Sequence, residues 1–225
     1  MKRLAKMAIA MTSLPSFSIK GLYAITPATV DTDYLLKQVE AALQGGATIL
    51  QYRNKPANHK LQTQQARALL PLCRRYKVPL IINDSVKICL TLDADGVHLG
   101  ANDGNLIEVR TRIGEDKILG ASCYNRFDLA LAAQQAGTNY VAFGACFNST
   151  TKPSAPVAGL DLFTRAKAEL NIPSVAIGGI TLQNAPNVIE VGADAIAVIN
   201  AIFSPNFALD KVKSASQQFS QLFKP

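Results

Sequence analysis

The feature that most constrains the fold is a regular alternation of short apolar runs with helical stretches. Eight runs of five or six residues are rich in aliphatic side chains and carry few charges. They are Gly21–Thr26, Ala47–Tyr52, Pro79–Asn83, Gly96–Gly100, Lys117–Ser122, Tyr140–Gly144, Ser174–Gly179 and Ala195–Ile199. Such brief, mainly apolar runs are typical of strands that are buried on both faces, as in parallel sheets.

The segments between the runs carry the periodicity of helices. Residues 31–46 repeat apolar side chains at helical spacing, with Asp31 or Asp33 as a candidate N-cap and Gly45-Gly46 as a C-terminal signal. Four further segments have similar patterns, and they are residues 61–76, 126–137, 161–170 and 209–223. Shorter helices are expected after Asp84 and after Gln183.

Eight strands that alternate with helices in a chain of 225 residues predict an α/β fold, a (β/α)8 TIM barrel with a closed parallel sheet. An open doubly wound sheet is the alternative, because the pattern alone does not prove closure. No linker rich in Pro, Gly or Ser divides the chain. We therefore expect one barrel domain over residues 19–225, preceded by an N-terminal extension over residues 1–18.

The amino-acid composition limits the kinds of molecule that we expect this protein to bind. The net charge is +7, yet the basic residues are spread along the chain, aromatic residues are only 7% and Trp is absent. A nucleic-acid surface needs dense basic patches or exposed aromatic rings, so we expect no nucleic-acid partner. The charge suits the attraction of anionic small-molecule substrates. A homo-oligomer is compatible with the sequence.

The cysteines and the N-terminus indicate a cytoplasmic protein. The four cysteines form no C-x-x-C pair, and a disulfide framework is not expected in a chain of this length. Lys6 interrupts the apolar stretch at the N-terminus, and no convincing cleavage site follows it. No apolar run reaches the 18 or more residues that a membrane span requires.

In a (β/α)8 barrel the active site lies at the C-terminal ends of the strands. Cations and hydroxyl groups follow several of the runs, and they are Arg53, Lys55, Ser122, Ser149, Thr151 and Lys152. Both residue types bind phosphate oxygens through strong hydrogen bonds. Gly178-Gly179 follows the seventh run, where backbone N–H groups often bind phosphate in this fold.

Two carboxylates stand among these cations. Asp84 and Asp103 follow the third and fourth runs, and Mg²⁺ commonly takes one or two carboxylates together with water and phosphate. The strand ends therefore predict phosphate groups with Mg²⁺ between them and the protein. Asp84 as a helix cap is the simpler alternative. His98 lies within a run and is expected to be a structural histidine.

At this point the sequence resembles thiamine-phosphate synthase. The segments that carry the resemblance run from about Gly21 to Ile202, and they are QYRNK, IND, GVHLGANDG, GAS, YVAFGACFNSTTKP, VAIGGIT and GADAIAVINAI. The resemblance implies a (β/α)8 barrel. It also implies a Mg²⁺-dependent transferase that joins a hydroxymethylpyrimidine diphosphate to a hydroxyethylthiazole phosphate, releasing diphosphate.

The resemblance also implies residue roles. Contacts to the pyrimidine diphosphate fall on Gln51, Arg53, Lys55, Asn83, Ser122 and Lys152. Asp84 and Asp103 match the Mg²⁺ ligands. Contacts to the thiazole phosphate fall on Ser149, Thr151, Gly179, Ile199 and Asn200. Arg53, Lys55, Ser122 and Lys152 are the residues expected to support the reaction by neutralising or orienting the diphosphate.

Two alternatives stay open. A thiazole tautomerase shares the barrel but depends on a histidine in the region where this chain has Tyr124. A non-catalytic barrel that binds phosphate ligands would not need both carboxylates. Ser85 stands where the family often has an arginine, so Arg53 and Lys55 are expected to carry more of the diphosphate charge.

Overall fold

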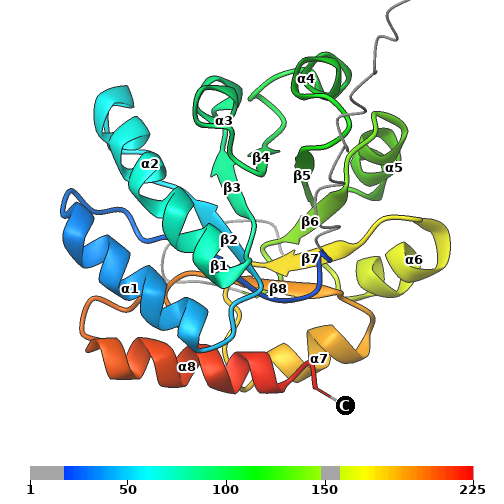
Figure 1. Ribbon diagram of the computed structural model, residues 1–225. Helices are drawn as coiled ribbons and strands as arrows, with labels where there is room; N and C mark the ends of the chain where they lie inside the picture. Colours follow the sequence, from blue (N-terminus) through cyan, green and yellow to red (C-terminus); the bar gives the residue numbers. More distant parts are fainter. Residues whose placement is uncertain (1–17, 148–157, 225) are drawn as a thin grey trace, which may run out of the picture.

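Eight parallel strands close into a barrel in this computed structural model, which describes residues 18–147 and 158–224 (Figure 1). Each strand pairs with the next along the chain, and β8 pairs back to β1. The strands are β1 (Gly21–Ile25), β2 (Ile49–Tyr52), β3 (Leu80–Asn83), β4 (Gly96–Leu99), β5 (Ile118–Tyr124), β6 (Tyr140–Gly144), β7 (Ser174–Ile177) and β8 (Ala195–Val198). The predicted closed barrel is confirmed, and the open sheet is excluded.

A helix follows each strand and covers the outside of the barrel (Figure 1). The helices are α1 (Thr32–Gln44), α2 (His59–Tyr76), α3 (Val86–Leu92), α4 (Leu106–Ile113), α5 (Phe127–Gln135), α6 (Asp161–Glu169), α7 (Ala185–Glu190) and α8 (Leu209–Gln221). Asp31 rather than Asp33 is the N-cap of α1, since its side chain accepts a hydrogen bond from the Tyr34 N–H. The sequence patterns did not indicate α4.

Alternate strand residues face two different cores. Residues pointing into the barrel form a small cluster that includes Tyr23, Ile49, Ile81 and Tyr140. Residues pointing outward, such as Leu22, pack with the helices in a much larger cluster. The interior cluster determines which side chains can reach the mouth of the barrel.

The expected N-terminal extension falls almost wholly outside the described residues. The domain boundary at residue 19 therefore stays a prediction. No helix in the two described ranges is long and apolar enough to cross a membrane.

Candidate active site

The candidate site lies where the strands end, because all eight strands of the barrel run in the same direction. Gln51 is within β2, Asn83 ends β3, and Ser122 lies near the end of β5. Arg53, Lys55, Asp84, Asp103, Gly179, Ile199 and Asn200 lie in the segments that follow their strands. Ser149, Thr151 and Lys152 lie outside the described residues, so their roles stay predictions.

A direct ion pair joins two of the predicted site residues. Lys55 Nζ lies 2.8 Å from Asp84 Oδ2, and both side chains are partly exposed. Lys55 comes from the segment after β2, whereas Asp84 follows β3, the neighbouring strand. The barrel thus brings together a cation and a carboxylate that are separated along the chain.

The backbone holds Asp84 in an unusual conformation. Its φ angle is +62°, in the left-handed region, and its N–H donates to the carbonyl of His98 at 2.9 Å. The N-cap of α3 is Ser85, whose hydroxyl accepts from the Ile88 N–H. The alternative that Asp84 caps this helix is therefore wrong, and its carboxylate pairs with Lys55 instead.

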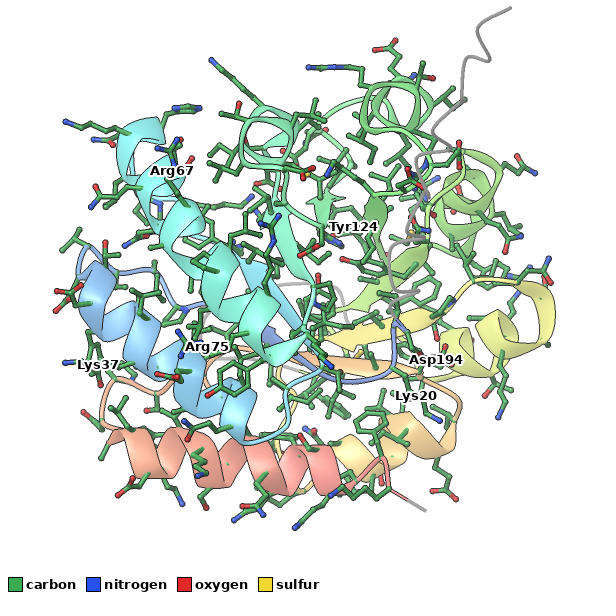
Figure 2. The ribbon with its side chains drawn as sticks, viewed as in Figure 1. Lys20, Lys37, Arg67, Arg75, Tyr124 and Asp194 are labelled. Atoms are coloured by element: carbon green, nitrogen blue, oxygen red, sulfur yellow. The ribbon has the colours of Figure 1, made fainter. Side chains whose placement is uncertain are left out.

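Asp103 lies in the exposed loop after β4. Its Oδ2 accepts a hydrogen bond from the N–H of Gly100 at 2.8 Å. The hydroxyl of Tyr124, at the end of β5, accepts weakly from the N–H of Ala101 in the same loop. Figure 2 shows Tyr124 apart from Lys20 and Asp194, which directly precede the paired strands β1 and β8.

The donor set at this edge of the barrel suits a hard cation. Asp84 and Asp103 follow adjacent strands, and the contact with Lys55 shows that Asp84 already faces positive charge. Among residues 18–147 and 158–224, no three or more His, Cys, Asp or Glu side chains form a cluster able to hold a metal ion. Mg²⁺ commonly takes only one or two carboxylates together with waters and substrate phosphates, so carboxylates after adjacent strands are compatible with it.

A buried polar network supports the loop that carries Arg53 and Lys55. Asn54 lies between them, is buried, and donates from Nδ2 to the Thr29 carbonyl and to Gln65 Oε1. The half-buried Arg53 is held by its backbone, since its N–H donates to the hydroxyl of Thr26 at 2.8 Å. The loop conformation is therefore fixed by the fold.

A second buried network crosses the interior of the barrel. Gln51 Nε2 donates to the Tyr23 hydroxyl at 2.9 Å, and the hydroxyl groups of Tyr23 and Tyr140 are 2.6 Å apart. His98 Nδ1 lies 2.9 Å from the Tyr140 hydroxyl, and His98 Nε2 lies 2.8 Å from Ser122 Oγ. Two predicted site residues, Gln51 and Ser122, thus stand at the ends of one hydrogen-bonded chain.

The interior also determines the charge of His98. Burial lowers the pKa of His98 to about 4, with a smaller raising contribution from Asp103 and a lowering one from Lys55. His98 is therefore neutral near pH 7. Its hydrogen bonds through both ring nitrogens agree with the structural role expected for it.

Gly179 and the Ile199–Asn200 pair lie on the rim of the barrel, the edge formed by the C-terminal ends of the strands. They follow β7 and β8, across the barrel from β3 and β4. Gly179 has a φ of +66°, and its carbonyl accepts from Asn184 Nδ2 at 3.0 Å. The carbonyl of Ile199 accepts from the N–H groups of Ile202 and Phe203, which forms a tight turn after β8. The carbonyl groups of Gly179 and Ile199 are therefore hydrogen-bonded within their own turns, and a phosphate at these segments would bind to backbone N–H groups.

The sequence did not indicate the interior residues that are hydrogen-bonded beneath the candidate site. Tyr23 and Tyr140 lie within apolar runs, where a tyrosine is usually a core residue. The only available signal was their place on the same strand face as Ile25 and Ala142, which line the barrel interior.

The fold and the rim define a class of protein. A closed (β/α)8 barrel with cations, carboxylates and backbone turns at its strand ends is typical of barrel enzymes that act on phosphorylated ligands. The sequence profile of the thiamine monophosphate synthase family matches residues 22–202. The chain therefore belongs to this family, whose members are transferases.

Individual relatives agree with the profile. The chain is 54% identical to a thiamine-phosphate synthase of Methylobacillus flagellatus, over 94% of this chain and 98% of that protein. It is 47% identical to one of Nitrosospira multiformis, over 95% and 89% of the two chains. The solved thiamine phosphate pyrophosphorylase of Pyrococcus furiosus superposes with a TM-score of 0.79, at 33% identity over 90% of this chain and 95% of that one.

Proposed function

We propose that this protein is a thiamine-phosphate synthase. It would join 4-amino-2-methyl-5-hydroxymethylpyrimidine diphosphate to hydroxyethyl-methylthiazole phosphate, giving thiamine phosphate and diphosphate. The 54% identity to a thiamine-phosphate synthase over nearly both full chains carries the proposal. The contact between Lys55 and Asp84 supports it, because it joins a diphosphate-binding cation to a candidate metal ligand.

The chemistry needs a good leaving group more than an enzyme nucleophile. Mg²⁺, when bound through Asp84 and Asp103, would neutralise diphosphate and stabilise it as it leaves. Arg53 and Lys55, which belong to the loop held by Asn54, would hold the leaving group in place. The aminopyrimidine can stabilise the methylene cation left when the C–O bond breaks, and the thiazole nitrogen then attacks that carbon.

The remaining rim residues would orient the two substrates. Gln51, Asn83 and Ser122 come from neighbouring parts of the rim on β2, β3 and β5 and would contact the pyrimidine diphosphate. Gly179, Ile199 and Asn200 would hold the thiazole phosphate through backbone and turn contacts. We extend the proposal to Lys152 on the diphosphate and to Ser149 and Thr151 near the thiazole phosphate.

Two other functions make different predictions for the same barrel. A thiazole tautomerase would isomerise a single thiazole compound and would need a histidine where this chain has Tyr124. A binding protein would take up phosphate ligands without turnover. The identity to synthases and the pair of carboxylates favour the synthase over both.

Product analysis distinguishes the three functions. Purified protein is incubated with both substrates and Mg²⁺, with each substrate alone, and with neither, and the products are separated and identified. The synthase predicts thiamine phosphate only when both substrates are present. Isomerisation of the thiazole alone would identify a tautomerase, and binding without any product would identify a binding protein.

We also propose that the protein works in the cytoplasm. The four cysteines are buried free thiols in the described structure, and burial raises the pKa of Cys89 and Cys146 to about 11. Protonated, buried thiols of this kind suit a reducing compartment.

A further inference from the structure

The buried chain of hydrogen bonds from Gln51 to Ser122 has a direction. An amide nitrogen can only donate, so Gln51 Nε2 makes the Tyr23 oxygen an acceptor. The Tyr23 hydrogen must then serve the Tyr140 oxygen, its other partner. The single donor at Gln51 thus determines which atom donates in each of the hydrogen bonds that follow.

The same direction continues through the histidine. The Tyr140 oxygen already accepts from Tyr23, so its own hydrogen goes to His98 Nδ1. A neutral imidazole carries one proton, which must then lie on Nε2 and be donated to Ser122 Oγ. Ser122 accepts within the barrel, and its hydroxyl hydrogen is left to donate to a ligand at the mouth.

We propose that Tyr23, Tyr140 and His98 are positioning residues that couple the hydrogen-bond polarity of two substrate contacts, Gln51 and Ser122, at opposite ends of one buried hydrogen-bonded chain. Ser122 is held as a donor, which suits an oxygen of the diphosphate or a ring nitrogen. Gln51 presents its amide oxygen as an acceptor, which suits an amino group of the pyrimidine. This inference rests on the proposed function for the identity of the ligand.

Burial restricts the motion of the residues in this hydrogen-bonded chain and keeps their hydroxyl groups protonated. Tyr23 and Tyr140 are almost wholly buried, and His98 is 7% exposed. Burial raises the pKa of both tyrosines well above the usual value. Both hydroxyl groups therefore keep their hydrogens near pH 7, and the directional pattern does not change through their ionisation.

A glycine on a neighbouring strand leaves room for one tyrosine of this hydrogen-bonded chain. Gly120 on β5 faces the Tyr140 ring, and a Cβ atom at Gly120 would lie 2.1 Å from Cζ of Tyr140. Rings of Tyr140 and His98 stack with centroids 5.6 Å apart. The tyrosine hydroxyl is thus placed by a glycine on one side and by the imidazole on the other.

The tautomer of His98 tests the direction without any substitution. The chain has only two histidines, and His59 is exposed at the start of α2, so it serves as an internal reference. Nitrogen NMR of the protein labelled with ¹⁵N-histidine is expected to show protonated Nε2 and unprotonated Nδ1 for His98. Protonated Nδ1 with unprotonated Nε2 would mean the opposite direction and would overturn the proposal.

Kinetics test the positioning role. In Tyr140→Phe, His98 Nδ1 loses its donor, so the Nδ1–H tautomer becomes accessible and Ser122 can turn its hydrogen inward. We expect kcat to fall by about tenfold with a smaller change in KM, since the cations that bind the diphosphate are unchanged. The hydroxyl of Tyr23 is one hydrogen bond further from His98 than that of Tyr140. Tyr23→Phe should therefore show a smaller loss of kcat and a smaller shift in the tautomer populations.

Tyr76→Phe is the matched control, since it removes a hydroxyl hydrogen-bonded to Glu40 and Gln44 at the C-terminal end of α2. It should leave kcat and the His98 signals unchanged. If both interior variants fold, judged by circular dichroism, yet keep wild-type kcat, the positioning role is overturned. Should Tyr140→Phe not fold, the wild-type tautomer and Tyr23→Phe decide. If wild-type protein makes no product, the proposed function fails, while the tautomer still tests the direction.

Discussion

Asp84 combines a left-handed backbone with a side chain paired to Lys55. Asn tolerates this conformation well, whereas Ala would add strain of about 1 kcal/mol, so Asp84→Asn isolates the charge. We expect kcat/KM with both substrates and Mg²⁺ to fall at least about 100-fold, because a proposed Mg²⁺ ligand is lost. The ion pair is partly exposed, so the free energy of unfolding should change by only about 0–1 kcal/mol.

Asp93→Asn is the control for this variant. Asp93 also has a positive φ, and its Oδ1 lies 2.6 Å from Lys117 Nζ, but it caps the C-terminal end of α3, away from the strand ends. Its kcat/KM should equal that of the wild type. Full activity of Asp84→Asn would contradict the proposal that Asp84 is a Mg²⁺ ligand.

His98 should make the stability of the protein depend on pH. Its pKa is about 4 in the fold and about 6.5 in an unfolded chain, so between these values the unfolded chain binds more protons. The free energy of unfolding therefore falls as the pH falls through this window, by about 2 kcal/mol at pH 5. Urea unfolding of wild type and His98→Gln at pH 7.5 and pH 5 measures this contribution.

The difference between the two proteins isolates the contribution of His98 to the pH dependence of stability, because the carboxylates titrate in both. The loss of stability between the two pH values should be about 2 kcal/mol larger in the wild type than in His98→Gln. Equal losses would show that His98 accepts a proton in the folded state.

Single residues also show how far the sequence could predict the site. Lys55 and Asp84 were predictable because charged residues directly after apolar strands have few structural reasons to be there. Tyr23 and Tyr140 were not, because a hydroxyl group within an apolar run does not reveal its partner. That partner depends on how strands that are distant in the chain face each other across the barrel interior, as β1 and β6 do for Tyr23 and Tyr140.

At the scale of elements, the loop after β2 is fixed by Asn54. Asn54→Ala would leave Gln65 and the Thr29 carbonyl each with one hydrogen bond fewer, at a cost to stability of about 1–3 kcal/mol. The loosened loop should raise KM for the pyrimidine diphosphate about tenfold. Steady-state kinetics with the thiazole phosphate held at saturation measure this change.

Asn139→Ala provides the comparison at the other end of the barrel. The side chain of Asn139 accepts from Arg110 Nη2 and from the Leu119 N–H, just before β6 begins. Its loss should also lower stability but leave KM unchanged. An equal rise of KM in both variants would mean that general loosening, and not the loop, affects substrate binding.

The elements themselves were largely predictable. All eight strands follow the apolar runs, because strands buried on both faces cannot carry many polar residues. Helix α4 was missed because its eight residues include Glu108, Arg110 and Arg112 among the apolar ones. Asn105, which caps this helix, was the signal that could have identified it.

At the scale of the whole molecule, closure of the barrel brings α1 against α8, and these helices lie side by side in Figure 1. A Cβ atom at Gly45, directly after α1, would lie 2.5 Å from the Lys213 carbonyl and 2.5 Å from Ser216 Cβ. Gly45→Ala should therefore lower the free energy of unfolding by about 1–3 kcal/mol, seen as a lower Tm.

Sterically harmless Gly→Ala changes usually stabilise a protein, so the sign of the effect is informative. Gln44→Ala, an exposed change at the adjacent position, should leave Tm close to that of the wild type. A higher Tm in Gly45→Ala would show that α1 and α8 can separate without cost.

Because the barrel is closed, the sequence predicts which residues lie near the candidate site but not which of them are in contact. The order of the strands was readable from the alternation of runs and helices, and it places every strand end on one rim. Which rim residues touch depends on the register of eight strand pairs, which no local pattern specifies.

Release of diphosphate as a function of free Mg²⁺ tests the central claim most directly. Wild-type protein with both substrates should release one diphosphate for each thiamine phosphate formed. Excess EDTA should stop both products, and restored Mg²⁺ should recover them. Thiamine phosphate formed at an unchanged rate in excess EDTA would contradict a magnesium-assisted departure of diphosphate from the barrel mouth.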